Sequence, residues 1–313
     1  LVWPDTPLHA ILLETAMIHM QPPVLAVIIS DFGRDAALRF VQTLAHLERD
    51  RIQDLLDENS LFFDEYRRIT LSITGDLPYV KRRALKTFGD RPLDERILVG
   101  FREGIPLEEI VPRLVLLALE AMTGPVSRGM TRIIVMLPCN TLAPASRRLE
   151  EAFVSADAVR QLLAEGDLLP PPAFEELATR WTDLRFGFPT VPGAVLRWAE
   201  QHGFTALLPL GTLGIHTKYA MEAKRLSSPV TVLTPDEGQQ QVALDAIGAA
   251  IDGTPPRRRE AHARLAAVQT DLLDAYKGHA ALIEACTDLD YGVGSDSNTL
   301  YAHQLLDLVY SSR

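Results

Sequence analysis

The stretch that decides the fold runs from Thr131 to Pro144 and reads Thr-Arg-Ile-Ile-Val-Met-Leu-Pro-Cys-Asn-Thr-Leu-Ala-Pro. Its apolar part, 133–137, is short and contains β-branched residues, which is typical of a buried strand in a parallel sheet. Cys139, Asn140 and Thr141 follow where this strand ends and a helix is expected to begin. A thiol, an amide and a hydroxyl beside the free N–H groups of a helix start form a favourable site for a carboxylate.

A second junction of the same kind lies near the other end of the chain. There Cys286 closes an apolar run and is followed by Thr287 and Asp288. Cys139 and Cys286 are the two cysteines of the sequence. Either thiol, taken singly, fits the interpretation of a small buried apolar side chain. Their shared position at a strand end, with a Thr close behind, indicates chemistry instead.

The pattern between and around these junctions alternates strands with helices, which predicts an α/β fold with parallel sheets and right-handed crossovers. The segment 107–122 has helical periodicity and is expected to be the crossover helix before Cys139. Asp296 is expected to cap the closing helix. Strands are predicted at 24–30, 68–74, 133–137, 186–191, 204–210 and 230–234, and directly before Cys286.

Polar residues also follow the first predicted strand. Ser30 and Asp31 stand where its apolar run ends. Open α/β sheets bind ligands at the carboxyl ends of their strands, so these side chains are candidates for substrate contacts. The same residues suit a helix cap, and the sequence leaves both interpretations open.

Composition limits the classes of partner. A chain of 313 residues with 47% hydrophobic residues has room for two globular domains. Its net charge of −10 argues against nucleic acid as a partner. Two cysteines predict no disulfide framework, and neither has zinc-ligand spacing to another Cys or His. The apolar segment 10–20 has no preceding basic residue and is predicted to be neither a secretory signal nor a membrane span, so we expect a cytoplasmic protein.

Two such thiols can act as an acid and a base. A helix N-terminus lowers the pKa of a thiol and makes the thiolate available near neutral pH. If the two junctions face each other across a cleft, one thiolate can take a proton from a substrate carbon while the other thiol returns one on the opposite face. This exchange inverts a stereocentre and requires no metal or organic cofactor.

Several spaced motifs strengthen this interpretation. In chain order they are Cys139-Asn-Thr, Gly211-Thr-Leu-Gly-Ile-His-Thr, Thr234-Pro-Asp-Glu, Cys286-Thr-Asp and Asp296-Ser-Asn-Thr-Leu-Tyr-Ala-His. The same order is found in the cofactor-independent aspartate/glutamate racemase superfamily of the two-cysteine type, which the chain resembles from roughly Val24 to Val309.

The resemblance implies two similar α/β subdomains related by a pseudo-twofold axis, with the active site between them. We expect the first to comprise 1–190 with 291–313, including an inserted helical segment at about 154–185, and the second to comprise 191–290. The insert could be a lid, an oligomer contact or a surface addition. The resemblance also implies a homodimer.

By position, the resemblance makes Cys139 and Cys286 the catalytic acid and base. It implies that Asn140, Thr141 and Thr287 hold the α-carboxylate or amine of a small amino-acid substrate, and that Thr212 lines the same pocket. Asp288 stands where aspartate racemases usually have Glu and glutamate racemases have His, so it can tune Cys286.

One departure from the family pattern concerns the substrate. Aspartate racemases have a Pro-Asp-Arg after the second strand, whose arginine binds the side-chain carboxylate. Here the corresponding residues are Pro78-Tyr-Val, with Lys81 and Arg82 just beyond. The substrate is therefore expected to be an acidic or related α-amino acid. The alternatives are decarboxylation, dicarboxylate isomerisation or lactam formation on the same scaffold, or a catalytically silent amino-acid-binding protein.

Overall fold

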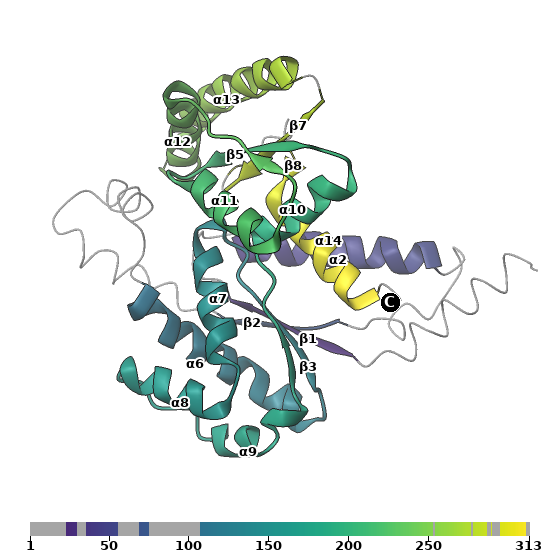
Figure 1. Ribbon diagram of the computed structural model, residues 1–313, viewed down its shortest axis with the longest axis vertical. Helices are drawn as coiled ribbons and strands as arrows, with labels where there is room; N and C mark the ends of the chain where they lie inside the picture. The colour runs from purple at the N-terminus through teal and green to yellow at the C-terminus, as the bar shows by residue number, and fades with distance from the viewer. Residues whose placement is uncertain are drawn as a thin grey trace, which may run out of the picture.

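The chain forms two four-stranded parallel sheets flanked by helices, which confirms the predicted α/β class. The computed structural model describes residues 23–29, 36–55, 69–74, 107–252, 254–276, 278–286, 289 and 295–310. Figure 1 shows the two sheets stacked along the long axis of the molecule.

The first sheet has the strand order β2-β1-β3-β4 and the second has the order β6-β5-β7-β8. The first sheet comprises β1 (Val24–Ile29), β2 (Ile69–Thr74), β3 (Arg132–Met136) and β4 (Arg185–Gly187). The second comprises β5 (Ala206–Gly211), β6 (Thr231–Val232), β7 (Ala280–Ala285) and β8 (Ser295–Asp296). The two orders match strand for strand, so β3 and β7 occupy the same place in their sheets.

Helices cover both faces of each sheet, so the alternating side chains of the strands are buried on both sides. The helices are α2 (Ala36–Leu55), α6 (Leu107–Ser127), α7 (Ala143–Ala152), α8 (Ala156–Glu165), α9 (Phe174–Thr179), α10 (Val191–Gln201), α11 (Ile215–Leu226), α12 (Glu237–Asp252), α13 (Pro255–Tyr276) and α14 (Ser297–Tyr310). Two short 3-10 helices, η1 (Asn140–Leu142) and η2 (Trp181–Asp183), complete the described elements.

One face of the first sheet packs on α6, α7, α8 and α9, and the other on α2, α14 and the first turn of α10. Within the described residues, α6 alone is long and apolar enough to cross a membrane, over Ile110–Ser127. That window is 61% buried inside the protein. Leu114 and Leu119 of α6 are fully buried against this sheet, as expected for the central helix of a globular core.

The second sheet is covered by α10 and α11 on one face and by α12 and α13 on the other. Leu207 of β5 faces α10 and α11, whereas its neighbour Leu208 faces α12 and α13. This alternation is that of a strand buried on both faces.

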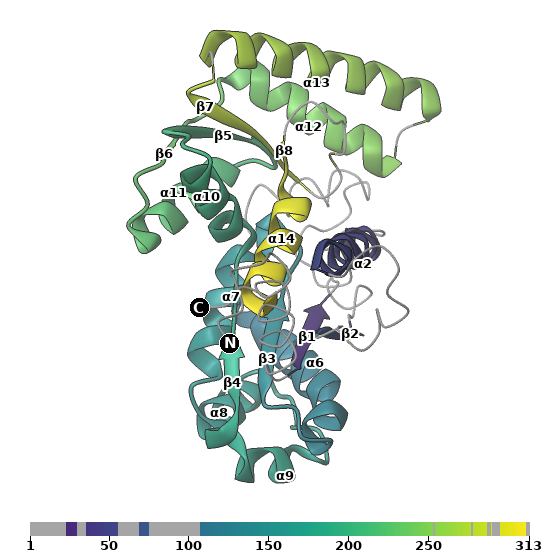
Figure 2. The ribbon, with the colours of Figure 1, turned by 90° about the vertical axis from the view of Figure 1, so that its right-hand side faces the viewer.

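Two helices each follow a strand of one sheet and pack into the core of the other sheet. Helix α10 follows β4 of the first sheet, yet its Val195 and Leu196 lie in the core of the second sheet. Helix α14 follows β8 of the second sheet, yet its Tyr301 and Leu305 lie in the core of the first. Figures 1 and 2 both show α14 in the middle of the molecule, between the two sheets. Each core therefore depends on a helix that follows the other sheet.

The predicted elements agree with the structure to within a few residues, with two exceptions. Strand β8 was not predicted, and β4 is three residues long rather than six. The expected helix at 107–122 extends to Ser127. Asp296 caps α14 as predicted, because its carboxylate accepts the backbone N–H groups of Asn298 (3.1 Å) and Thr299 (2.9 Å).

The inserted segment is folded against the first sheet by an aromatic cluster. Phe153 contacts the rings of Trp181, Phe186 and Phe188 at centroid distances of 5.1–5.6 Å. Helix α9 and η2 lead into the amino end of β4, which pairs with the amino end of β3. Because Cys139 follows the carboxyl end of β3, this part of the insert lies at the opposite edge of the sheet and is not a lid over Cys139.

Candidate functional site

The two cysteines stand at equivalent places in the two sheets. Cys139 follows β3 and Cys286 follows β7, the third strand of each sheet. Each residue is 8% exposed, and neither thiol is in a disulfide. Both therefore lie at the carboxyl edge of a parallel sheet, where α/β folds place ligands.

The side chain of Asn140 joins the carboxyl edges of the two sheets. Its amide nitrogen Nδ2 donates to Ser297 Oγ at 3.0 Å, and its Oδ1 accepts the Tyr219 hydroxyl at 2.8 Å. Tyr219 belongs to α11, which follows β5, and Ser297 begins α14, which follows β8. In the second sheet β7 lies between β5 and β8. Asn140 therefore reaches the positions on either side of the strand that ends at Cys286.

These contacts give Asn140 a structural part in the site. Its predicted role, to hold the carboxylate or amine of a substrate, stays a prediction. The observed hydrogen bonds fix the amide between two helices and leave Asn140 2% exposed. Burial raises the pKa of Tyr219 well above its usual value, with the charge of Asp296 adding to the effect, so the hydroxyl stays protonated and donates.

Thr212 lies at the same edge as Cys286. Gly211 at the end of β5 pairs with Ala285 at the end of β7, so Thr212 and Cys286 follow side by side. A Cβ on Gly211 would lie 2.7 Å from the carbonyl oxygen of Ala285, so the two strands approach more closely than a side chain allows. Thr212 is 2% exposed, and its Oγ1 has no hydrogen-bond partner among the described residues.

Two more buried polar atoms near these strand ends lack a hydrogen-bond partner within the described ranges. They are His216 Nδ1 in the first turn of α11 and Asn298 Oδ1 in the first turn of α14. Buried polar atoms are nearly always satisfied, by protein, water or ligand. Together with Thr212 they give this edge of the second sheet unused hydrogen-bonding capacity for a small polar molecule.

Lys218 is a residue of the site that the sequence pattern did not single out. It lies half-buried in α11, next to Tyr219. Burial lowers the pKa of Lys218, and the charge of Cys139 acts in the opposite direction. The sequence signal that could have indicated Lys218 is its place on the helix that follows β5 and the motif Gly211-Thr-Leu-Gly. The sequence alone does not show that this helix packs near Cys139.

Glu222 is the buried carboxylate of an ion cluster between α7, α10 and α11. Its carboxylate contacts Arg147 Nη2 at 2.5 Å and Arg225 Nη2 at 2.7 Å, and it accepts the Thr190 hydroxyl at 2.7 Å. Burial alone would raise the pKa of Glu222, but the hydrogen bonds from Arg225, Arg147 and Thr190 outweigh it and lower the pKa to about 2. The cluster ties α7, which follows Cys139, to the helix that carries Lys218.

Several predicted site residues lie outside the part of the chain that the structure describes. They are Ser30, Asp31, Thr287 and Asp288, together with the side chain of Thr141 and the cations Lys81 and Arg82. Their assignments stay predictions. Among the described residues, no three His, Cys, Asp or Glu side chains group as metal ligands do.

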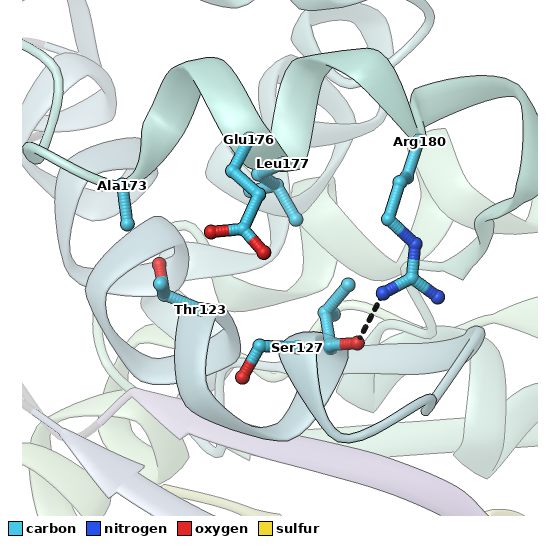
Figure 3. Close-up of a pocket in the computed structure, with 7 residues that line it drawn as sticks. Thr123, Ser127, Ala173, Glu176, Leu177 and Arg180 are labelled. Atoms are coloured by element: carbon cyan, nitrogen blue, oxygen red, sulfur yellow. Dashed lines mark hydrogen bonds between the residues drawn. The ribbon is translucent and has the colours of Figure 1, made fainter.

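Two hollows among the helices that cover the first sheet lie away from Cys139 and Cys286. Figure 3 shows one between α6 and α9, lined by Thr123, Ser127, Glu176 and Arg180, in which the Arg180 guanidinium donates to the Val126 carbonyl at 2.7 Å. Its volume of about 10 Å³ suits a single water molecule. A more open groove of about 370 Å³ lies between α6, α7 and α8 and is rimmed by charged side chains, including Arg148 and Glu165.

Comparison with known proteins relates the architecture to solved structures. Neither a protein-family model nor a curated protein matches the chain. A protein provisionally named an Asp/Glu racemase, from Yersinia pestis, aligns with a TM-score of 0.53 and 13% identity over 92% of this chain and 100% of that chain. An aspartate racemase homologue from Pyrococcus horikoshii OT3 aligns with a TM-score of 0.50 and 13% identity over 93% and 100% of the two chains. The chain, with two similar parallel sheets and a cysteine after the third strand of each, thus has the α/β fold of structures from the Asp/Glu racemase family.

Proposed function

We propose that the protein is a cofactor-independent racemase or epimerase of an acidic or related α-amino acid, with Cys139 and Cys286 as its two acid–base groups. The observation that carries this proposal is the pair of hydrogen bonds that the Asn140 side chain makes with residues that follow strands of the second sheet. Asn140 adjoins Cys139, and its amide contacts the helices that follow both neighbours of the strand ending at Cys286.

The proposed reaction exchanges one proton for another. One cysteine, as thiolate, removes the α-hydrogen of the amino acid. The other, as thiol, gives a proton to the opposite face of the same carbon, and the configuration inverts. The carboxyl edge of the second sheet supplies polar groups for the substrate, among them Thr212 Oγ1, which is buried and accepts or donates no hydrogen bond in the part of the chain that the structure describes. The protonation state belongs to the pair of thiols, so a pH–rate profile would report both.

The test is exchange of the substrate α-hydrogen in deuterated solvent. Both enantiomers of aspartate, glutamate and other α-amino acids are incubated with the wild type, Cys139→Ser and Cys286→Ser. We expect exchange and inversion in the wild type and a loss of about 10²–10⁴-fold in either variant, because general acid–base catalysis is worth that much.

The rival functions give different results in the same experiment. If only one of the two substitutions abolishes turnover, the result favours a reaction that uses a single cysteine, such as decarboxylation, dicarboxylate isomerisation or lactam formation, over racemisation. If amino acids raise the melting temperature but no hydrogen exchanges, the protein is a binding protein and the proposal is wrong. A control variant, Lys224→Met on the exposed end of α11, should keep wild-type exchange.

A further inference from the structure

Both cysteines pack against apolar side chains. Cys286 belongs to an apolar cluster with Leu210, Leu282 and Ala243, and Cys139 belongs to the cluster that contains Leu137 and Leu142. Apolar burial favours a neutral thiol at either position. Cys139 also lies at a turn that α11 approaches from the other sheet, so a charge on α11 can act on it.

The approach of α11 is fixed by a hydrogen bond. Tyr219 donates to Asn140 Oδ1 at 2.8 Å, which holds this part of α11 against the residue next to Cys139. Lys218 is the neighbour of Tyr219 and carries its ammonium group on a half-buried side chain. The interaction between the Lys218 ammonium and a Cys139 thiolate raises the pKa of Lys218, against the larger effect of burial.

In the described part of the chain, other titratable groups near this turn come from α11 and α14. Tyr301 of α14 lies by the backbone of Leu137, and burial raises its pKa, so it carries no charge there. Tyr219 is neutral because burial raises its pKa, and His216 lies two residues before Lys218. The carboxylate of Asp296 acts on Tyr219, but it is held by the backbone N–H groups of Asn298 and Thr299. The positive charge of Lys218 therefore acts on Cys139. The negative charge of Asp296 is instead stabilised by the backbone N–H groups at the start of α14.

We propose that Lys218 is a positioning residue that holds Cys139 as the thiolate, which makes Cys139 the resting base and Cys286 the resting acid of the pair. The assignment of Cys139 as base and Cys286 as acid depends on the proposed racemisation, whereas the interaction between the Lys218 and Cys139 charges does not depend on it. In the forward step the Cys139 thiolate gains the α-proton and becomes a thiol, and the Cys286 thiol loses its proton to the carbon and becomes a thiolate. Return of a proton through solvent restores the resting pair.

The test uses the fact that the chain has two cysteines. In a Cys286→Ser background, Cys139 is the one remaining thiol, and its thiolate is followed by ultraviolet absorbance as the pH rises. We expect Lys218→Met to raise the apparent pKa of Cys139 by about one unit or more, because a nearby opposite charge shifts a pKa by that amount. Lys218→Arg should restore the wild-type titration, since it retains the charge.

Two controls separate this effect from a general disturbance of the fold. Lys224→Met removes a positive charge from the exposed end of the same helix and should leave the Cys139 titration unchanged. In a Cys139→Ser background, Lys218→Met should leave the titration of Cys286 unchanged. An unmoved Cys139 titration in Lys218→Met, or an equal shift of Cys286, would overturn the proposal.

These titrations need no turnover, so they can be judged separately from racemisation. If the protein exchanges no α-hydrogen but the Cys139 titration shifts as expected, racemisation is wrong and the role of Lys218 stands. If exchange occurs and the titration does not shift, racemisation stands and the role of Lys218 is wrong.

Discussion

At the scale of single residues, Glu222 gives the molecule a predicted dependence on pH. Its pKa of about 2 lies below the usual value of 4.5, so the ionised carboxylate stabilises the folded state at neutral pH. That contribution is lost as the pH falls from about 4.5 to about 2. Glu222→Gln should lower the free energy of unfolding by about 3 kcal/mol at pH 7, from the size of the shift.

The check is urea unfolding of wild type and Glu222→Gln between pH 7 and about pH 2. The difference between the two proteins should shrink toward zero across the acidic range, because the wild-type carboxylate becomes protonated there. Glu151→Gln is the matched control, since its 2.8 Å pair with Arg148 is exposed on both sides and should be worth less than about 1 kcal/mol. A difference that stays constant with pH would contradict the prediction.

Candidate site residues could be predicted from the sequence where a local pattern marks them. Cys139 and Cys286 were singled out because each closes an apolar run, and the structure places both at strand ends. Lys218 and Tyr219 were not singled out, and Ser297 stood within a quoted motif without a role of its own, although Tyr219 and Ser297 both contact Asn140. Their contacts cross between two sheets, and a pattern within one segment does not show which other segment it will meet.

At the scale of elements, the junction of β5 and β7 has no room for an added methyl group. Gly211→Ala would place a Cβ 2.7 Å from the Ala285 carbonyl oxygen, which is backbone and cannot rotate away. We expect a loss of about 2 kcal/mol in the free energy of unfolding, as for other overpacked sites. Urea denaturation measures it.

Gly248→Ala is the control for that substitution. Gly248 lies within α12, and a Cβ there would have nothing within 4 Å. Since Gly disfavours a helix, the change should stabilise the protein by about 0.5–1 kcal/mol. Equal effects of the two substitutions would show that the close approach of β5 and β7 is unimportant.

Elements with a long periodic pattern were the predictable ones. The segment from Leu107 onward gave the correct helix, and the apolar run at Val24 gave the correct strand. Strand β8 was missed because it is two residues long, Ser295–Asp296, and neither residue is apolar. Its pairing with β7 is fixed by the sheet it joins, and Asp296 carried a stronger signal for a helix cap.

At the scale of the whole molecule, the exchanged helices predict that the two cores unfold together. Leu305 of α14 belongs to the core of the first sheet, whereas Trp198 of α10 packs against the core of the second. Leu305→Ala should lower the free energy of unfolding by about 2–5 kcal/mol. We expect the urea transition reported by Trp198 to shift by the full amount, although Trp198 is in the other core.

Tryptophan fluorescence can separate the two reporters. In one background Trp3 and Trp181 are replaced by Phe, which leaves Trp198. In the other, Trp3 and Trp198 are replaced, which leaves Trp181 in the core of the first sheet. Each fluorescence transition is compared with far-ultraviolet circular dichroism of the same variant. A shift seen by Trp181 alone would mean that the two halves unfold independently.

The two sheets have matching strand orders, and the helix that follows the last strand of each sheet packs in the core of the other. This arrangement suggests how such a chain can arise. Two copies of a half-length chain would complete each other by the same trade of helices, as an intertwined pair. Joining the copies end to end preserves that pair within one polypeptide. Once joined, the two halves can change in sequence independently, so each thiol can acquire neighbours that the other lacks.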